Sequence, residues 1–480
     1  MATKIMTETE ARAIFQQGED AVLAWMLATD KRLRQLESQL GQNSQNSSKP
    51  PSSDQTGGKT LKPMVRTLRQ KTGKKPGGQK GHKGNTLQQV EVTDEKHIQH
   101  HRPPQCPHCN SDLSGAESAG YTRRQVFDIP EPVLEVVEHR AHALVCPCCA
   151  AQVKADFPEG VDQPVQYGPN IVGLGVYLHA QHLVPFGRTA QILREITGSA
   201  FSQGTLFNQL LKAFGRLTGF EEDLKSALAD APILHVDETS VRQEGSRCWI
   251  HARSTGTLTW LFAHKQRGGP EVMADLKEFG ATLVSDFWSS YLKLDCAHQF
   301  CVAHLCRELQ GAFESTGQSW ARELKEHLLD CNAACHRARA RQAGKLWDAR
   351  RRAALYDVLV LEGLGQTPAP IQGKGKGKGK SKSKGKVRNL LERLWDWRDP
   401  VLGFLFDLSL PFTNNEAERS VRMSKVKAKV SGGFRTQEGV KVFCRLRSYT
   451  QTCAKQGMNV LQCIRSIFSG HLILPSLNPA

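Results

Sequence analysis

The residues with the clearest chemical potential are two glutamates at the start of a strongly basic segment. Glu416 and Glu418 lie within residues 413–422, which read TNNEAERSVR. From Arg419 to Arg447 the chain then carries nine lysines and arginines against one acid, Glu438. A carboxylate in such surroundings suits a protein that carries a metal ion to a phosphate backbone. The pattern therefore predicts two further carboxylates upstream that complete a metal site.

Two aspartates upstream follow predicted strands. The buried run 233–236 ends at Asp237, and a strand over 281–285 ends at Asp286. Strands over 248–253 and 258–264 and a helix over 270–279 lie between them. This β-β-β-α-β order, with acids after the first and fourth strands, predicts an RNase H-like mixed sheet in which those two strands are neighbours. A third acid from a downstream helix completes such a site, and Glu418 fits that role.

These residue types suit displacement at a phosphodiester. The reaction requires two Mg²⁺ ions about 3.5–4 Å apart, one to activate the attacking hydroxyl and one to stabilise the leaving oxygen. Mg²⁺ prefers carboxylate oxygen. We expect Asp286 and Glu418 to bind one ion each and Asp237 to bridge both, with Mn²⁺ able to substitute.

Each acidic motif leaves an alternative. Glu238 follows Asp237, and neighbours on a strand point to opposite faces, so only one of the two can face the site. Residues 413–416 match a Ser/Thr-x-x-Glu capping box, which predicts a helix from near Asn414 and gives Glu416 a structural role. The structural alternative for Glu418 is an i,i+4 pair with Arg422.

Two cysteine pairs predict a zinc site within residues 100–155. Residues 106–109 read CPHC and residues 146–149 read CPCC, with strands expected over 125–129 and 133–145. Two such knuckles supply the four soft ligands of tetrahedral Zn²⁺, which would stabilise a small DNA-binding module. Cys148 is a spare thiol that makes the second knuckle ambiguous. The predicted ligands are Cys106, Cys109, Cys146 and Cys149.

Composition points to a polyanionic partner in the cytoplasm. The 480 residues carry 64 Lys and Arg against 47 Asp and Glu, a formal net charge of +17. Nucleic acid is the default partner of such a chain. No apolar run approaches the roughly 18 residues of a membrane span, and no secretory signal is visible. The 14 cysteines are then thiols or metal ligands rather than disulfides.

Besides the zinc module, the N-terminal half holds three predicted segments. Residues 7–40 form a coiled-coil-like helix, for which packing within its own domain is favoured slightly over self-association. Residues 41–99 comprise a Ser/Pro-rich linker and a basic arm that becomes ordered on phosphates. Residues 165–222 are helical, and their 189–207 part resembles helix-turn-helix, although core packing is slightly favoured. The arm's predicted DNA contacts are Lys74, Lys75, Lys80 and Lys83.

The C-terminal half holds the predicted catalytic domain. It spans residues 230–450, with a helical insertion over about 305–408 that includes a disordered Gly/Lys loop at 370–387. A C-terminal element, 451–480, follows. In the basic segment after Glu418, the predicted grips on the DNA backbone are Arg419, Arg422, Lys425, Lys427 and Arg435.

The ordered set of motifs resembles the insertion sequence 66 family of bacterial transposases, over nearly the whole chain. The matching segments are residues 43–54 (NSQNSSKPPSSD), 77–82 (GGQKGH), the two cysteine knuckles, 235–239 (HVDET), Asp286 before Trp288 and Tyr291, 301–305 (CVAHL), 307–309 (REL), 414–419 (NNEAER) and 432–435 (GGFR).

The resemblance implies a DDE transposase with an RNase H-like core, and it selects Asp237 rather than Glu238. The family's acids map onto Asp237, Asp286 and Glu418. Its expected partners are double-stranded DNA, both element ends and target, a second copy of the chain and accessory proteins of the same element. The expected location is the nucleoid of a bacterial cytoplasm. The fold expected is multidomain α/β: an N-terminal helix, basic linker, zinc-ribbon-like module and helical region before the catalytic core.

Two other functions remain open from the residues. One is an RNase H-like nuclease or resolvase, and the other is a catalytically inactive, zinc-dependent DNA-binding descendant. Cys301 and His304 form a further C-x-x-H pair. A metal role for this pair would need two more ligands, for which Cys296, His298 and Cys306 are candidates, and a structural role near the site is favoured.

Overall fold

The computed structural model of the chain describes residues 8–40, 42, 46, 87–129, 134–368 and 385–478. It divides into two units. One comprises Val65–Val136 with Ile196–Gly198, and the other comprises Met1–Met64, Val137–Glu195 and Ser199–Ala480. The described residues form fourteen α-helices and a five-stranded mixed sheet, which confirms the predicted multidomain α/β class. Within these ranges no helix is both long and apolar enough to span a membrane.

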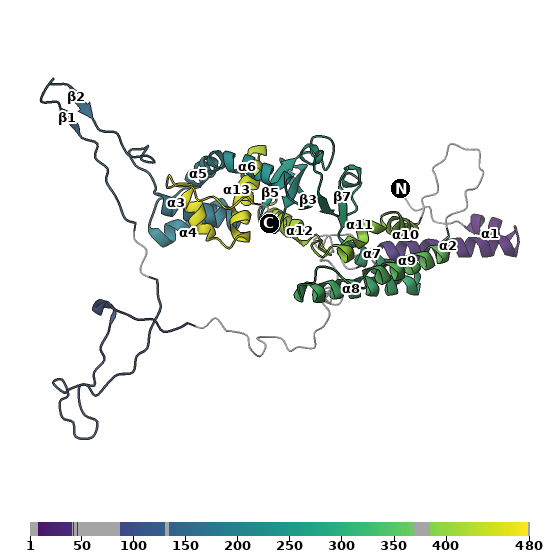
Figure 1. The fold of residues 1–480 in the computed structure, drawn as a ribbon, viewed down its shortest axis with the longest axis horizontal. Coiled ribbons are helices and arrows are strands. Elements are labelled where there is room, and N and C mark those ends of the chain that lie inside the picture. The colour runs from purple at the N-terminus through teal and green to yellow at the C-terminus, as the bar shows by residue number, and fades with distance from the viewer. Residues whose placement is uncertain are drawn as a thin grey trace. The chain divides into compact units, whose positions relative to one another are not determined.

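The central sheet has the order β5-β4-β3-β6-β7 (Figure 1). Its strands are β3 (Ile233–Gln243), β4 (Ser246–Ser254), β5 (Thr259–His264), β6 (Thr282–Ser285) and β7 (Ala297–Phe300). The first three run as an antiparallel meander, whereas β3, β6 and β7 are parallel. The two strands that precede the predicted aspartates are therefore neighbours in the sheet.

Strand β3 is longer than predicted, so Asp237 does not end it. The strand continues to Gln243, which pairs with Ser246 across a two-residue turn. Glu244 and Gly245 both have positive φ, +50° and +75°. That conformation is the type I′ turn, whose twist matches a continuing antiparallel hairpin. Only residues 233–235 pair with β6, so Asp237 lies just beyond the parallel part of the strand.

The helix predicted over 270–279 is wrong. Only a single 3₁₀ turn, Ala274–Leu276, forms there. The buried Arg253 explains this, because its guanidinium donates to the Val272 carbonyl (3.1 Å) and to Asp275 (2.7 Å). These contacts close the segment as a turn against the sheet. Its apolar side chains still enter the core, as the periodicity required.

Helices cover both faces of the sheet. On one face α12 (Asn415–Ser431) and α13 (Gln437–Lys455) bury Ala417, Val421 and Phe443 against β3, β4 and β5. The other core joins the sheet to the preceding helices and to α14 (Val460–Ser466). Those helices are α3 (Pro169–Val176), η3 (Tyr177–Gln181), α4 (Phe186–Thr197), α5 (Gln203–Arg216) and α6 (Thr218–Ala229). Leu193 of α4 and Leu206 of α5 belong to this core, while DNA reading by this pair stays a prediction.

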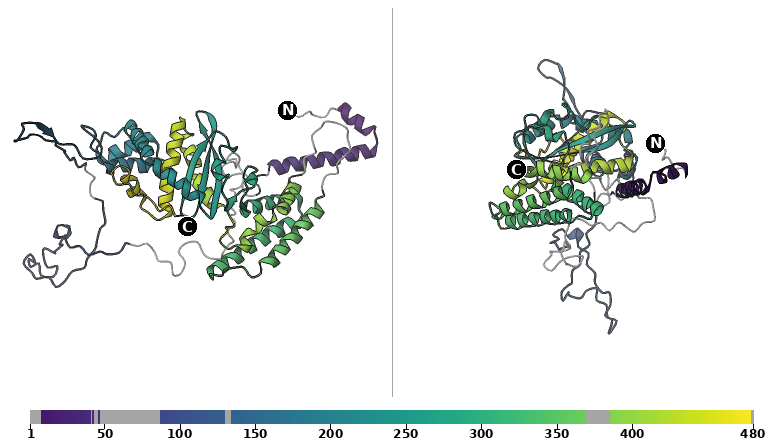
Figure 2. Two further views of the ribbon diagram at one scale, coloured as in Figure 1. Left: turned by 45° about the horizontal axis from the view of Figure 1, so that its top comes forward. Right: turned by 90° about the vertical axis from the view of Figure 1, so that its right-hand side faces the viewer.

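In the described part of the chain, five helices lie between β7 and α12. They are α7 (Val302–Thr316), α8 (Ser319–Ala340), α9 (Ala349–Gln366), α10 (Lys386–Asp396) and α11 (Arg398–Phe406). Their core centres on the fully buried Trp320 and Tyr356. Helices α7, α8 and α9 lie side by side in this bundle (Figure 2). The bundle keeps its own core, so the insertion does not interrupt the sheet that carries the candidate acids.

The N-terminal elements also differ in part from prediction. The expected helix breaks into α1 (Glu8–Phe15) and α2 (Glu19–Leu40) at Gly18, which has φ +101°. Residues 125–129 form no strand, and the 133–145 strand shortens to β1 (Ala143–Val145), paired with β2 (Gln152–Lys154). The hairpin therefore closes around the second cysteine knuckle, because β1 and β2 pair directly across it. A 3₁₀ turn, Glu95–His97, precedes the first knuckle.

Two adjacent glycines after α12 provide a test of how this helix is joined to β3. Phe434 bridges to Gln243, and its N–H donates to the Arg242 carbonyl (2.8 Å). A Cβ on Gly433 (φ +147°) would lie 2.4 Å from that carbonyl oxygen, whereas one on Gly432 (φ +73°) would meet nothing within 4 Å.

We expect Gly433→Ala to lower the free energy of unfolding by about 2–3 kcal/mol, through clash and backbone strain. Gly432→Ala should cost only about 1 kcal/mol, because its strain is conformational alone. Urea unfolding of both variants measures the difference, and equal losses would show that the Phe434 bridge is not under this constraint.

Candidate active site

Strands β3 and β6 bring Asp237 and Asp286 to the same level of the sheet. Their parallel register pairs His235 with Val284, so two further residues along each strand reach Asp237 and Asp286. Local backbone contacts orient both carboxylates. Asp237 accepts a hydrogen bond from the Glu238 N–H (2.9 Å), and Asp286 accepts one from the Trp288 N–H (3.0 Å).

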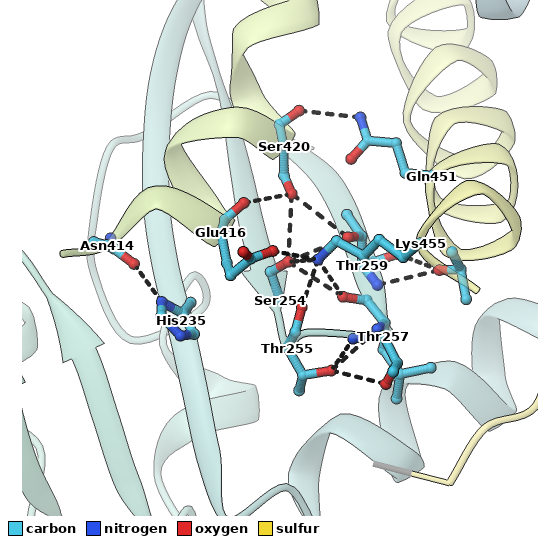
Figure 3. A network of polar contacts seen from close by, with 12 residues as sticks. His235, Ser254, Thr255, Thr257, Thr259, Asn414, Glu416, Ser420, Gln451 and Lys455 are labelled. Atoms are coloured by element: carbon cyan, nitrogen blue, oxygen red, sulfur yellow. Dashed lines mark hydrogen bonds and ion pairs between the residues drawn. The ribbon is translucent and has the colours of Figure 1, made fainter. Parts of the chain in front are cut away.

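Helix α12 supplies the third carboxylate because its first turn is fastened to β3. Asn414 is 2% exposed. Its side-chain amide donates to the Val236 carbonyl (2.7 Å), and His235 Nδ1 donates to its Oδ1 (2.9 Å; Figure 3). These contacts involve the two residues that immediately precede Asp237 on β3. Glu418 follows one turn along the helix.

The predicted capping box is wrong. Asn414, not Thr413, occupies the N-cap, and its side chain binds β3 instead of the helix. Glu416 lies 3.4 Å from the Lys455 ammonium group. Lys455 also donates to Ser254 Oγ (2.7 Å) and to the Leu258 carbonyl (3.0 Å), and burial lowers its pKa to about 8. Glu416 thus joins α12 to α13 and the β4–β5 turn (Figure 3).

Burial raises the pKa of all three carboxylates, and neighbouring acids raise the pKa of Asp237 and Asp286 further. Burial, and then the charges of Glu238, Asp286 and Glu418, raise the pKa of Asp237 well above its ordinary value. Burial and Glu238 raise the pKa of Asp286 to about 6. Burial raises the pKa of Glu418, which Arg307 partly offsets. Oxygen donors that repel one another in this way suit a divalent cation, because the cation removes both the repulsion and the need for protons.

Glu238 points away from these acids and is fully engaged. Its side chain is 2% exposed. One carboxylate oxygen accepts from Arg267 (2.8 Å) and the other from the Tyr291 hydroxyl (2.7 Å). The strand geometry therefore leaves Asp237 as the acid of this pair that faces α12.

Cys301 and His304 lie against Glu418. The Cys301 thiol is 3.7 Å and His304 Nε2 is 3.9 Å from the same oxygen, Glu418 Oε1. In the part of the chain that the structure describes, these are the three residues grouped closely enough to share a metal ion. The candidate further ligands are not part of this group: Cys306 lies in the insertion core, and Cys296 contacts His298. Burial raises the pKa of Cys301 to about 12 and lowers that of His304 to about 3, which makes both neutral.

The predicted DNA contacts on α12 differ in exposure. Arg419, Arg422 and Arg435 are exposed. Lys425 lies two turns after Glu418 and donates to the Ser240 carbonyl (3.0 Å). Burial lowers its pKa, and the charge of the nearby Asp237 partly offsets that shift. Lys427 is 8% exposed, so burial removes it from the predicted contacts. The arm residues Lys74, Lys75, Lys80 and Lys83 lie outside the described residues.

The two cysteine knuckles fold as the same turn. In each, the first cysteine accepts an N–H from the residue four positions on (2.9 Å) and donates to the carbonyl five positions on (2.9 and 2.8 Å). Asn110 and Ala150 have matching φ values of +59° and +55°. Cys149 is therefore equivalent to Cys109, and Cys148 to His108, which supports Cys149 as the ligand.

Comparison with known families gives the chain its class. The IS66 family of transposases matches residues 164–442, and the zinc-finger binding domain of transposase IS66 matches residues 103–150. A family of unknown function, DUF6444, matches residues 3–88. No curated protein matches the chain. The family match over residues 164–442 thus indicates a nucleic-acid-processing enzyme. The chain belongs to the IS66 transposase family, and its zinc-finger match supports structural zinc.

The equivalence of the knuckles yields a test of the zinc ligands. We expect Cys149→Ser to lose zinc, because a serine hydroxyl is a poor substitute for thiolate. Cys148→Ser should keep the wild-type zinc content. Metal analysis of the purified variants decides, and zinc loss from the Cys148 variant alone would reverse the assignment.

The raised pKa of Asp286 predicts a stability cost that depends on pH. The folded state holds this proton to about pH 6, against an ordinary value of 3.8, so the cost grows as pH rises from about 4 to 6 and is complete above it. In magnesium-free buffer at pH 7.5, Asp286→Asn should raise the free energy of unfolding by on the order of 2 kcal/mol.

The gain should shrink as pH falls from 6 towards 4 and vanish below about pH 3, where the carboxyl is protonated in both states. Asp295→Asn, at an exposed position nine residues on, is the matched control and should change little. Thermal unfolding across this pH range measures both variants. A destabilised Asp286 variant at pH 7.5 would contradict the repulsion inferred at the site.

Proposed function

We propose that this transposase cleaves and joins DNA strands by a two-metal mechanism, with Asp237, Asp286 and Glu418 as the metal ligands. The observation that carries the proposal is the convergence on Asp237: the register of β3 and β6 aligns it with Asp286, and the charges of Asp286 and Glu418 each raise its pKa. The sheet order and strand directions are those expected of an RNase H-like core, which supports the same conclusion.

In this proposal the catalytic domain comprises residues 230–450, interrupted by helices α7 to α11. Asp237 would contact both ions, while Asp286 and Glu418 would each hold one. Bound Mg²⁺, or Mn²⁺ in its place, would activate the attacking hydroxyl and stabilise the leaving oxygen.

The protein's own residues prepare this site before DNA arrives. Asn414 fixes the start of α12 and hence the position of Glu418. The neutral pair Cys301 and His304 orients the Glu418 carboxylate without adding charge. Lys425 and Arg307 supply positive charge beside the acids, so that a phosphate backbone can approach carboxylates that would otherwise repel it.

The substrates in this proposal are the ends of the mobile element and a target duplex. Exposed Arg419, Arg422 and Arg435 would contact the backbone, and the zinc module would contribute to binding the ends. Joining two ends requires at least two copies of the chain, with accessory proteins of the element as further partners. The place of action is the bacterial nucleoid.

Substitution of each acid tests the mechanism. Asp237→Asn, Asp286→Asn and Glu418→Gln should each lower DNA cleavage and strand transfer by at least about 10³-fold, because one ligand oxygen loses its charge. Binding to DNA that carries the element ends should stay within about threefold, since base and backbone contacts lie elsewhere.

Glu416→Gln is the matched control: the same residue type in the same helix, two positions away, and it should retain cleavage within about tenfold. Measurable cleavage by any of the three acid variants at the wild-type rate would remove that residue from the mechanism. Cleavage without any joined product would favour an RNase H-like nuclease, and binding without cleavage by the wild type would favour an inactive descendant.

A further inference from the structure

Arg267 is held rigidly beside the candidate active site by residues that the mechanism does not use. It lies in the loop between β5 and the 3₁₀ turn at Ala274–Leu276. Its guanidinium is bound by Glu238 through Nε (2.8 Å) and Nη2 (2.7 Å). It also lies over the rings of Trp249 (5.2 Å) and Trp288 (4.7 Å). A long, flexible side chain therefore has one fixed orientation in the absence of DNA.

Glu238, which holds Arg267, adds charge repulsion at the candidate metal site. The charge of Glu238 raises the pKa of both Asp237 and Asp286. The charge of this buried acid therefore destabilises the ionised forms of Asp237 and Asp286. Its oxygens are instead taken by Arg267 and by the buried hydroxyl of Tyr291 (2.7 Å). Glu238 thus acts on Arg267 rather than on a metal.

Close packing couples the Arg267 loop to the segment that follows Asp286. A Cβ on Gly268 would lie 2.6 Å from the Trp288 ring and 2.8 Å from Ser290 Oγ, so only glycine fits this approach. Trp288 in turn packs edge-on against Tyr291, with ring centroids 5.0 Å apart. Asp286 and Arg267 are therefore positioned by one packed group, and the charge of Arg267 lowers the pKa of Asp286.

Part of the guanidinium remains available. The Arg267 side chain is 43% exposed, and its Nη1 makes no hydrogen bond within the described residues. An arginine with two nitrogens fixed and a third free presents an oriented donor to an anion. Next to carboxylates that would carry metal ions, the anion that fits is a phosphodiester of the DNA strand.

We propose that Arg267 binds a DNA phosphate adjacent to the scissile one, with Glu238, Trp249 and Trp288 as the residues that position it. The inference rests on the proposed function for where the scissile phosphate lies. Because Glu238 fixes the guanidinium in advance, little side-chain freedom is lost when DNA binds, and the phosphate is held in one place relative to Asp286.

The test distinguishes the contribution of the Arg267 charge to DNA affinity from its role in positioning the phosphate for cleavage. The double variant Glu238→Gln/Arg267→Gln leaves no unpaired buried charge, so it should fold with a near-native melting temperature. DNA affinity is measured against salt concentration in magnesium-free buffer, and cleavage is measured separately with Mg²⁺. We expect the slope of log K against log salt to fall by about one and cleavage to fall by roughly 10–100-fold.

Two more variants keep the test decisive. Arg267→Lys retains the ion pair but not the planar fork, so the salt slope should persist while cleavage drops. Lys277→Gln removes an exposed charge from the next segment and should change neither. If the double variant unfolds, the Arg267→Lys result decides alone.

The proposal would be overturned if the double variant kept the wild-type salt slope and cleavage rate, or if Arg267→Lys cleaved at the wild-type rate. Either result would leave Arg267 as a neutralising partner of Glu238. Failure of this proposal can be told apart from failure of the two-metal mechanism. The salt slope is measured without Mg²⁺ and without any substitution of Asp237, Asp286 or Glu418.

Discussion

The arrangement of the site depends on how the start of α12 is tied to β3. Asn414 makes this connection with a buried side chain: its amide donates to the Val236 carbonyl and its oxygen accepts from His235. Its own N–H donates to the Cys301 sulfur (3.2 Å). One residue thereby joins the strand of Asp237, the helix of Glu418 and the end of β7. This connection, together with the packing of Ala417 and Val421 on the sheet, sets the position of Glu418 relative to Asp237.

The second constraint is the repulsion that this convergence creates. Burial alone raises the pKa of a carboxyl, and neighbouring acids raise it further. Within the described residues, none of the three acids forms an ion pair with lysine or arginine, which would occupy the oxygens that we propose as metal ligands. It places Cys301 and His304, both uncharged, at Glu418, and confines the strong ion pair of this region to Glu238 and Arg267. The repulsion among the acids remains, at a cost to stability that functional sites commonly carry, and the proposed metal ions would relieve it.

Much of this could be predicted from the sequence, because strand order and the spacing of the acids follow from period-two patterns and turn residues. The adjacency of β3 and β6 was predicted because this strand and helix order is the layout of an RNase H-like fold, and the helix start beside Asn414 was predicted from the capping-box pattern. Other features depended on contacts between distant residues. The 270–279 segment had helical spacing, but the buried Arg253 drew it into turns. Residues 413–416 had the letters of a capping box, yet Asn414 bound β3 and Glu416 met Lys455, 39 positions away. Arg267 gave no signal, since its meaning comes from Glu238 and two tryptophans that only the fold brings together.

A crystal structure of the chain with Mn²⁺ and bound DNA ends would test the central claim most directly. Anomalous scattering locates manganese independently of any assumption about ligands. The account predicts manganese bound by Asp237 and shared with Asp286 on one side and Glu418 on the other. Manganese on Glu238, or held by Cys301 and His304 with none between Asp237 and Asp286, would contradict it.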